Sequence, residues 1–256
     1  MSYRAMTRPT KRLLSSAALL AALMSIVLTL PAQAQRGRAP EDKAGVFDYY
    51  TLVLSWSPTY CASVAAPDDE PQCRTGHRAR PYAFVLHGLW PQYERGYPEY
   101  CRTRERPFVP RRIIDGMLDI MPSSRLVIHE YRKHGTCAGL DPEGYYGLSR
   151  ELHDKIKVPK RFQFPGAPFF ISPQATVDEF MRANPGLKEE MLIVECRGSG
   201  NRLREVRVCF SREGEFRACG ANERRSACRA NRMYVPPVRG GMGAAPMPRP
   251  AHERTL

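Results

Sequence analysis

Two kinds of hydrophobic spacing divide the chain into predicted strands and predicted helices. Residues 47–56 (FDYYTLVLSW) and 82–86 (YAFVL) are dense in aromatic and β-branched side chains, which is typical of buried strands. Residues 191–196 and 203–210 predict two further strands, and the Gly-Ser-Gly-Asn sequence between them predicts a hairpin turn.

Apolar residues recur at helical spacing in the segments 113–121, 126–134 and 145–156. A fourth predicted helix, at 176–183, begins with Thr-Val-Asp-Glu, a sequence typical of helix N-termini. The pattern contains no internal repeat and no second-domain boundary. We therefore expect one folded domain.

The two ends of the chain depart from this pattern. Four basic residues precede an apolar run at 13–30, and Pro-Ala-Gln-Ala follows it, which predicts a signal peptide at residues 1–34. A membrane anchor is the alternative, but the run is long enough to span a membrane only if its Ser and Thr residues are counted. Residues 35–46 predict a flexible lead-in, 47–234 the folded domain, and 235–256 a disordered basic tail.

Charge and cysteine content narrow the class of protein. The formal net charge is +13, and removal of the four basic residues of the predicted signal peptide leaves +9. This charge favours a polyanionic partner, although solubility alone would explain it equally well. All eight cysteines follow the predicted cleavage site and none forms a C-x-x-C pair, so we expect four disulfides, whose pairing the spacing does not choose.

Titratable residues concentrate in the segment HEYRKHGTC at 129–137. On a helix, spacing of four residues places His129 beside Lys133 and Glu130 beside His134, and the helix is expected to stop at the Gly-Thr-Cys sequence. A solvated helix face with ion pairs is the ordinary explanation of such a segment. Two of the chain's six histidines in one short stretch favour a functional explanation.

A zinc site is the first alternative for this segment, because His-Glu followed by a second His is similar to the H-E-x-x-H motif. That motif places its histidines four residues apart, whereas His129 and His134 are five apart, or about 140° around a helix that turns about 100° per residue. One ion cannot easily bridge them. We therefore expect a metal-free acid/base site, which needs a second proton carrier.

His87 is the candidate for that proton carrier. It follows the strand predicted at 82–86, in the sequence HGLWPQ, where Gly and Pro predict a turn that exposes the histidine. Without the second cluster, a packed aromatic neighbour of Trp90 would be its ordinary role. The following loop carries tyrosines and arginines, which can stack on unpaired bases and hold phosphates, although each of them could equally be solvated.

The segments FVLHGLWP at 84–91 and HEYRKHGTC at 129–137 together resemble the two active-site segments of the T2 family of ribonucleases, which are exported or vacuolar endoribonucleases. The segment YTLVLSWSPTYC at 50–61 looks like the first core strand of that family, and the resemblance extends over about 47–228. It implies an α+β fold with a central, mostly antiparallel β-sheet, packed helices and four disulfides.

The resemblance also implies a role for each residue of the site. His87 would be the general acid, His134 the general base, and His129 the phosphate-binding residue. Glu130 and Lys133 would stabilise the transition state. The residues expected to contact substrate are Trp90, Tyr93 and Leu126. Many family members carry aromatic residues where this chain has Leu126 and Val127, so the base preference stays open.

The implied activity is metal-independent cleavage of single-stranded RNA by a phosphorus–oxygen lyase. Transphosphorylation would form a 2′,3′-cyclic phosphate, and hydrolysis would then give a 3′-phosphate. RNA is the expected partner. We expect no cofactor, no cleavage of DNA, no stable membrane association after signal cleavage, a secreted or periplasmic location and a monomer. A catalytically weak RNA-binding or host-interaction protein on the same fold is the alternative.

The resemblance implies a disulfide pairing as well. The expected pairs are Cys61 with Cys73, Cys101 with Cys137, Cys196 with Cys228, and Cys209 with Cys219.

Overall fold

The computed structural model describes residues 42–76 and 79–238. The signal peptide expected at 1–34, the first part of the lead-in and the tail from 239 onward lie outside the described residues. Within the described part, no helix has the length and apolar character needed to cross a membrane.

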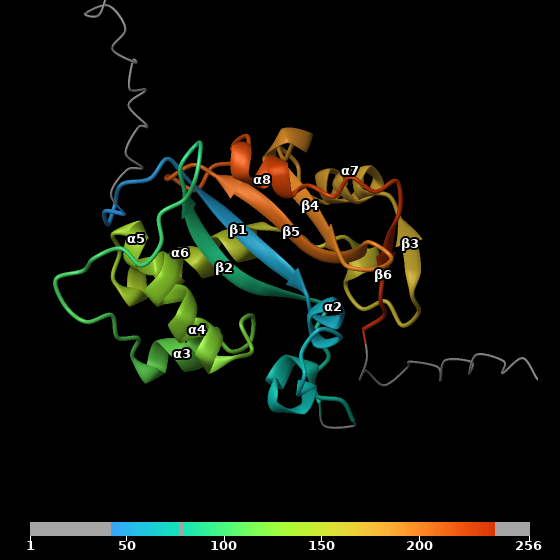
Figure 1. The fold of residues 1–256 in the computed structure, drawn as a ribbon, viewed down its shortest axis with the longest axis horizontal. Coiled ribbons are helices and arrows are strands. Elements are labelled where there is room, and N and C mark those ends of the chain that lie inside the picture. The colour runs from blue at the N-terminus through green and yellow to red at the C-terminus, as the bar shows by residue number, and fades with distance from the viewer. Residues whose placement is uncertain (1–41, 77–78, 239–256) are drawn as a thin grey trace, which may run out of the picture. The chain divides into compact units, whose positions relative to one another are not determined.

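A six-stranded sheet forms the centre of the domain (Figure 1). Its strands are β1 (Tyr49–Trp56), β2 (Phe84–Gln92), β3 (Phe169–Ile171), β4 (Leu192–Arg197), β5 (Arg202–Phe210) and β6 (Met233–Val235). The path through the sheet is β2-β1-β5-β6-β3, and β4 pairs with β5. All pairs are antiparallel except β5 with β6. The expected α+β fold with a mostly antiparallel sheet is confirmed.

The helices flank this sheet, and α6 runs behind it in the view of Figure 1. They are α2 (Ser57–Cys61), α3 (Arg111–Met117), α4 (Ser124–Glu130), α5 (Thr136–Ala138), α6 (Pro142–Lys155), α7 (Pro173–Ala183) and α8 (Ala221–Ser226). A π-helical segment, Tyr131–Gly135, joins α4 to α5 without a break. The four predicted helices are therefore present.

Alternation along β1 separates the two faces of the sheet. Tyr50, Leu52, Leu54 and Trp56 point into the main hydrophobic core, together with side chains of β2, β5, α6 and α7. Complete burial of a side chain of leucine size stabilises a fold by about 1.5–3 kcal/mol. Thr51, Val53 and Ser55 point to the opposite face, where the polar side chains of the candidate site gather.

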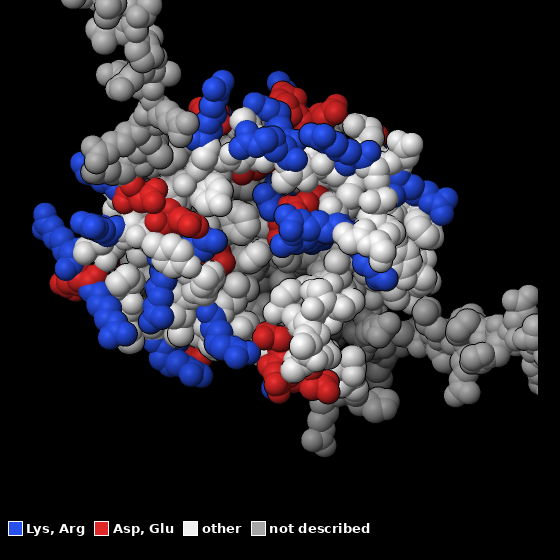
Figure 2. Space-filling model, in the orientation of Figure 1, with Lys and Arg blue, Asp and Glu red and all other residues white. Residues whose placement is uncertain are grey.

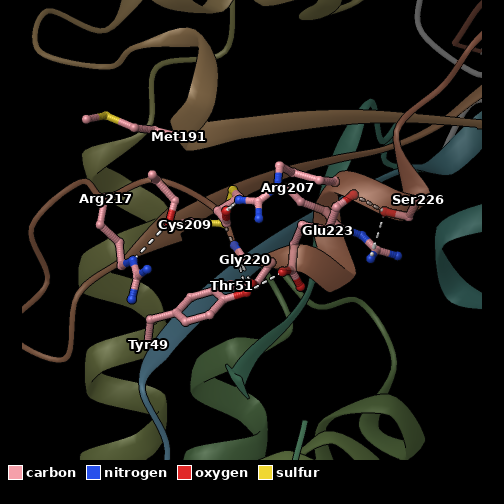
Figure 3. Close-up of a disulfide and its surroundings, with 12 residues drawn as sticks. Tyr49, Thr51, Met191, Arg207, Cys209, Arg217, Gly220, Glu223 and Ser226 are labelled. Carbon is pink, nitrogen blue, oxygen red and sulfur yellow. Dashed lines mark hydrogen bonds between the residues drawn. A yellow bond between two sulfur atoms is a disulfide. The ribbon is translucent and has the colours of Figure 1, made fainter. Parts of the chain in front are cut away.

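A smaller cluster lies on that opposite face, under α8 (Figure 3). It contains Tyr49 and the disulfide between Cys209 and Cys219. The hydroxyl of Tyr49 donates to Glu223 and accepts from the backbone N–H of Gly220 at 3.0 Å. These bonds hold α8 against the sheet, because all three partners are buried.

The four disulfides join the cysteine pairs that the resemblance implied. Cys61–Cys73 closes the loop after α2, and Cys101–Cys137 joins the loop after β2 to α5. Cys196–Cys228 and Cys209–Cys219 connect the β4–β5 hairpin to the segments on either side of α8.

Two boundaries differ from the sequence-based expectations because of long-range contacts. The turn expected after Leu86 is wrong, because β2 continues to Gln92. Pro91 is tolerated there because β2 is an edge strand of the sheet. Residues 235–238 belong to the folded domain and not to the expected tail, since Val235 and Val238 are buried in the main core.

The helix that carries the titratable cluster also ends later than expected. It continues through Gly135 to Ala138 and ends at Gly139, whose φ of +73° is the left-handed conformation that commonly terminates helices. The helix predicted at 176–183 is α7, which begins earlier, at Pro173. The side chain of Ser172 caps it by accepting from the N–H of Ala175 at 3.0 Å.

Candidate active site

A β-bulge in β2 aims His87 at the open face of the sheet. Val53 of β1 pairs with Gly88 and Leu54 pairs with Leu86, so His87 is the extra residue between them. Without the bulge, strict alternation would turn either Leu86 or Leu89 out of the core. Because of it, both leucines are fully buried and His87 faces the site, as bulges beside functional sites often arrange.

Gly88 allows the strand to approach the helical half of the site closely. A Cβ atom at this position would collide with Glu130 Oε2 and lie 2.6 Å from Trp90 Nε1. The Trp90 N–H donates to Glu130 Oε2 at 2.8 Å, and Glu130 Oε1 lies 3.8 Å from His87 Nε2. Glu130 therefore contacts Trp90 and His87, whereas the helical spacing predicted that it would lie beside His134.

The π-helical segment supplies the other half of the site. A π-helix has i→i+5 hydrogen bonds and therefore more residues per turn than an α-helix, and such segments are frequent at functional sites. Here it carries Lys133 and His134. The His134 ring stacks on Trp90 with centroids 5.0 Å apart, and the His87 ring meets the same indole edge-on at 5.2 Å. Trp90 therefore contacts both imidazoles.

His134 is a neutral imidazole at ordinary pH. Its ring is 4% exposed, and its Nδ1 atom has no hydrogen-bond partner among the residues that the structure describes. Burial lowers its pKa to about 2, aided by the charges of Lys133, His87 and His129. A buried imidazole that is neutral can accept a proton.

His87 has the opposite electrostatic surroundings. Its Nδ1–H donates to Glu205 Oε1 at 3.2 Å, and Ser55 Oγ lies 3.4 Å away. Burial alone would lower the pKa of His87, but the hydrogen bond with Glu205 and the charges of Glu130 and Glu205 raise it above its ordinary value. His87 is therefore held in the protonated form beyond the pH at which a free imidazole loses its proton.

The two remaining titratable residues of the cluster lie on either side of this centre. Lys133 is 3.4 Å from Glu99 and lines a cavity of 360 Å³ together with Trp90, His134 and Tyr97. His129 lines a cavity of 260 Å³ together with His87 and Leu126. Burial lowers the pKa of His129, as do the charges of Lys133 and His87. The buried Glu130 has a raised pKa because burial outweighs its cationic and hydrogen-bonding neighbours.

The three residues expected to contact substrate are placed differently. Trp90 and Leu126 each line one of these two cavities. Tyr93 directly follows β2, and its side chain is instead buried in the main core, while its N–H donates to the carbonyl of Gly96 at 3.1 Å. Tyr97, which is 51% exposed, occupies the cavity in its place.

Glu205 and Arg207 of β5 complete the site, and sequence reasoning missed both. Glu205 is 1% exposed and faces Glu195 directly across the β4–β5 pair. Arg207 Nη2 bridges these carboxylates, at 2.6 Å from Glu195 Oε2 and 2.7 Å from Glu205 Oε2. Burial alone would raise the pKa of Glu205, but His87 and Arg207 lower it to about 2.

Arg207 also joins the carboxylates to the aromatic centre of the site. Its guanidinium lies over the Trp90 ring, 5.2 Å from the centroid. From β5, Glu205 therefore contacts His87 and Arg207 contacts Trp90. The only sequence signal for this support was a run of charged residues inside an otherwise hydrophobic strand, REVRV at 204–208.

In the described part of the chain, no group of three or more His, Cys, Asp or Glu side chains is arranged to hold a metal ion. The polar groups that converge are instead two imidazoles, two buried carboxylates, an ammonium and a guanidinium. They can donate and accept protons beside a bound anion.

Comparison with known proteins identifies the family to which this arrangement belongs. The Ribonuclease T2 family matches residues 47–219. A ribonuclease of Aeromonas hydrophila is 39% identical over 179 residues, which is 67% of this chain and 75% of the relative. Ribonuclease I of Escherichia coli is 29% identical over 180 residues, 56% of this chain and 67% of that relative. The chain belongs to the Ribonuclease T2 family.

Solved structures share the fold. The SF11-RNase of Nicotiana alata has a TM-score of 0.55 and 20% identity, covering 74% of this chain and 98% of that one. A variant of RNase MC1 in complex with 5′-UMP has a TM-score of 0.55 and 20% identity, covering 73% and 97%. The resemblance seen in the sequence is confirmed, and the chain is an RNA endonuclease of the T2 type.

Proposed function

We propose that this enzyme cleaves single-stranded RNA without a metal ion, in two steps. In the first step, the 2′-oxygen attacks the adjacent phosphorus and the bond from phosphorus to the 5′-oxygen breaks, which leaves a 2′,3′-cyclic phosphate. In the second step, water opens the cyclic phosphate to a 3′-phosphate. DNA lacks the 2′-hydroxyl and is not a substrate.

His134 is the general base that takes the proton of the 2′-hydroxyl. This role is supported by the burial of the ring and by the cationic groups nearest to it, which keep His134 neutral before substrate binds. A bound phosphodiester brings negative charge beside Lys133 and so offsets one cause of the low pKa. His134 then becomes a stronger base in the complex than in the free enzyme.

His87 is the general acid that protonates the leaving 5′-oxygen. This role is supported by two carboxylates that favour the charged imidazole. Glu205 Oε1 lies 3.2 Å from His87 Nδ1, and Glu130 Oε1 lies 3.8 Å from His87 Nε2. Glu205 also fixes the orientation of the ring, since it accepts from Nδ1 and leaves Nε2 as the donor to substrate. Arg207 in turn holds Glu205 in place.

Lys133 and His129 bind the phosphate from either side, and Lys133 with Glu130 stabilises the transition state. An ammonium near the developing phosphorane oxygens offsets their added charge, while Glu130 holds Trp90 and supports the charged form of His87.

The two cavities accept the nucleosides on either side of the cut. The cavity with Trp90 and Tyr97 adjoins His134, so it takes the nucleoside that supplies the 2′-hydroxyl. The cavity with Leu126 adjoins His87, so it takes the leaving nucleoside. Aromatic and aliphatic walls offer stacking surface to either base.

The observation that carries this proposal is a pair of imidazoles on one indole whose surroundings shift their pKa values in opposite directions. Its test is incubation of the purified protein with RNA in EDTA, followed by analysis of the ends. Undiminished cleavage with cyclic-phosphate ends is the expected result. Retention of RNA without cleavage would support a weak catalyst that binds RNA, and loss of cleavage in EDTA would support a metallohydrolase.

Export to the periplasm or medium is part of the same proposal. Four disulfides close loops throughout the described domain, and such bonds persist mainly in oxidising compartments. Detection of the processed protein, beginning at residue 35, outside the cytoplasm would support it. Accumulation of the full-length chain in the cytoplasm would contradict it.

A further inference from the structure

A third cavity adjoins His87 and shares Ser55, Tyr60 and His87 with the cavity that contains Leu126. It has a volume of 590 Å³ and lies between the end of β1, α2 and the β4–β5 hairpin. Its polar lining includes Ser55, Tyr60, His87, Arg197, Arg202 and Arg204, together with Glu205. Figure 2 shows Lys and Arg side chains gathered over β4 and β5, beside a hollow in this face of the molecule.

The arginines of this wall outnumber the acidic groups that they could neutralise. Glu195 and Glu205 are the buried carboxylates beneath them, and Arg207 already bridges both. Arg197 and Arg204 contact Glu195 as well, at 2.8 Å and 3.3 Å. Three guanidinium groups thus share two carboxylates, and Arg202 adds a fourth positive charge to the cavity wall, so the cavity keeps a surplus of positive charge.

Arg202 is the cation of this wall that the carboxylates leave unmatched. In residues 42–76 and 79–238 it makes no ion pair, and its guanidinium lies over the Tyr234 ring at 5.1 Å from the centroid. A planar guanidinium stacked on an aromatic ring keeps its N–H groups directed outward in the plane. Arg202 is therefore held ready to bind an anion.

A second β-bulge directs Arg204 into the same cavity. Glu195 pairs with Glu205 and Cys196 pairs with Leu203, so Arg204 is the extra residue. Its guanidinium is held by Glu195 at 3.3 Å and by Glu205 at 3.7 Å, and its side chain is 37% exposed. Since a guanidinium has five N–H donors, the two carboxylates leave some of them available to a ligand.

The direction of the reaction indicates which anion fits. His87 donates its proton to the 5′-oxygen of the leaving nucleotide in the function proposed above. The strand that continues from that nucleotide therefore runs past His87, and the next group of high negative charge along it is a phosphodiester. We propose that Arg202, Arg204 and Arg197 bind this downstream phosphate, so that the enzyme prefers RNA that extends beyond the nucleotide after the cut.

This inference rests on the proposed function, and small substrates separate the two. The test compares kcat/KM for three substrates in EDTA: ApA, ApAp, which adds only a 3′-phosphate, and ApApA, which adds a further nucleoside. We expect ApAp to exceed ApA by about tenfold, as one charge-assisted hydrogen bond would allow. Absence of cleavage of all three substrates and of longer RNA would reject the proposed function itself.

Variants of Arg202 then locate the effect. Arg202→Gln should reduce the ratio of ApAp to ApA toward one, and Arg202→Glu should reduce it further, because a carboxylate repels the added phosphate. The matched control is Arg111→Gln, which removes the same charge from an exposed position on α3 outside this cavity and should keep the wild-type ratio.

Three outcomes would overturn the inference while leaving the proposed function intact. Wild-type enzyme could cleave ApA and ApAp equally well, Arg202→Gln could keep the full ratio, or only ApApA could gain, which would assign the cavity to a base. As a further check, the salt dependence of kcat/KM for longer RNA should be weaker in Arg202→Gln, by about 0.7 in the logarithmic slope for one phosphate contact.

Discussion

The site has a strand half, β2, and a helical half, the π-helical segment, and each half contributes a histidine with opposite electrostatic surroundings. His87 stands on β2 beside Glu205 and Glu130, and these carboxylates raise its pKa. His134 stands on the π-helical segment, where burial and Lys133 lower its pKa to about 2. Two histidines that contact the same indole can therefore hold different protonation states, because the neighbouring charges and burial set the pKa of each imidazole.

The two halves also differ in what holds them in place. His87 belongs to a strand that pairs with β1 along most of its length, and a buried carboxylate of β5 fixes its ring. The helical half is connected to the loop after β2 by the Cys101–Cys137 disulfide. Substitutions on each side should therefore fail in different ways, and the expected effects below run from the largest to the smallest.

Removal of either imidazole should abolish most turnover. His87→Ala and His134→Ala should each lower kcat by about 10²- to 10⁴-fold, because each removes a positioned acid or base. Thermal unfolding of both variants should still be cooperative. His153→Ala, on α6, is the matched control and should keep wild-type activity. Near-normal cleavage by either active-site variant would remove that histidine from the proposed mechanism.

Loss of the Cys101–Cys137 disulfide should loosen the helical half. Replacing both cysteines by serine should lower the free energy of unfolding by about 2–4 kcal/mol, since the bond closes a loop with a sequence separation of 36. It should also lower kcat/KM, because Cys137 lies three residues after His134.

Its control is the same double replacement at Cys61 and Cys73, which are separated by 12 residues. This shorter loop should cost less free energy of unfolding, and activity should be less affected. Urea unfolding and kcat/KM of both double variants provide the measurement. Equal losses of activity would show that the tie to α5 has no special role in the site.

Gly88→Ala should disturb the junction between the halves. The added Cβ would collide with the Glu130 carboxylate, so we expect a loss of about 1–3 kcal/mol in unfolding free energy together with reduced turnover. Gly116→Ala is the control, because its Cβ would meet nothing within 4 Å and it lies inside α3. It should be neutral or stabilise by about 0.5–1 kcal/mol.

Glu205→Gln should bring the pKa of His87 closer to that of His134. Loss of the negative charge lowers the pKa of His87, so the alkaline limb of the pH profile of kcat/KM should move to lower pH while the acidic limb stays. The maximal rate should fall less than in His87→Ala. Glu215→Gln, an exposed carboxylate paired with Lys155, is the control. An unshifted alkaline limb would show that Glu205 does not tune His87.

Much of the fold could be predicted from the sequence because it depends on local patterns. The strand at 47–56 is strongly hydrophobic, the hairpin at 191–210 is marked by its Gly-Ser-Gly-Asn turn, and the four helices have clear helical spacing. The segment at 129–137 stood out because it concentrates titratable residues. The short strands β3 and β6, three residues each, were missed, because segments of that length carry too little periodic signal.

The arrangement within the site depended on contacts between distant parts of the chain. His87 and Glu205 are 118 residues apart, and only strand pairing through β1 brings them together. The bulge at His87 and the π-helical segment at His134 both alter the regular spacing from which neighbours are inferred. For this reason Glu130 was expected beside His134 and was found bonded to Trp90 instead.

The contact of Trp90 with both imidazoles has a consequence for how the enzyme completes a cycle. Among the described residues no hydrogen bond joins His87 to His134, so a proton cannot pass directly from one ring to the other. If the proposed roles hold, the first step leaves His134 charged and His87 neutral. The protonation states of the two histidines therefore record that the first step has taken place. The exchanged states are those needed to activate water against the cyclic phosphate, and hydrolysis restores the starting arrangement.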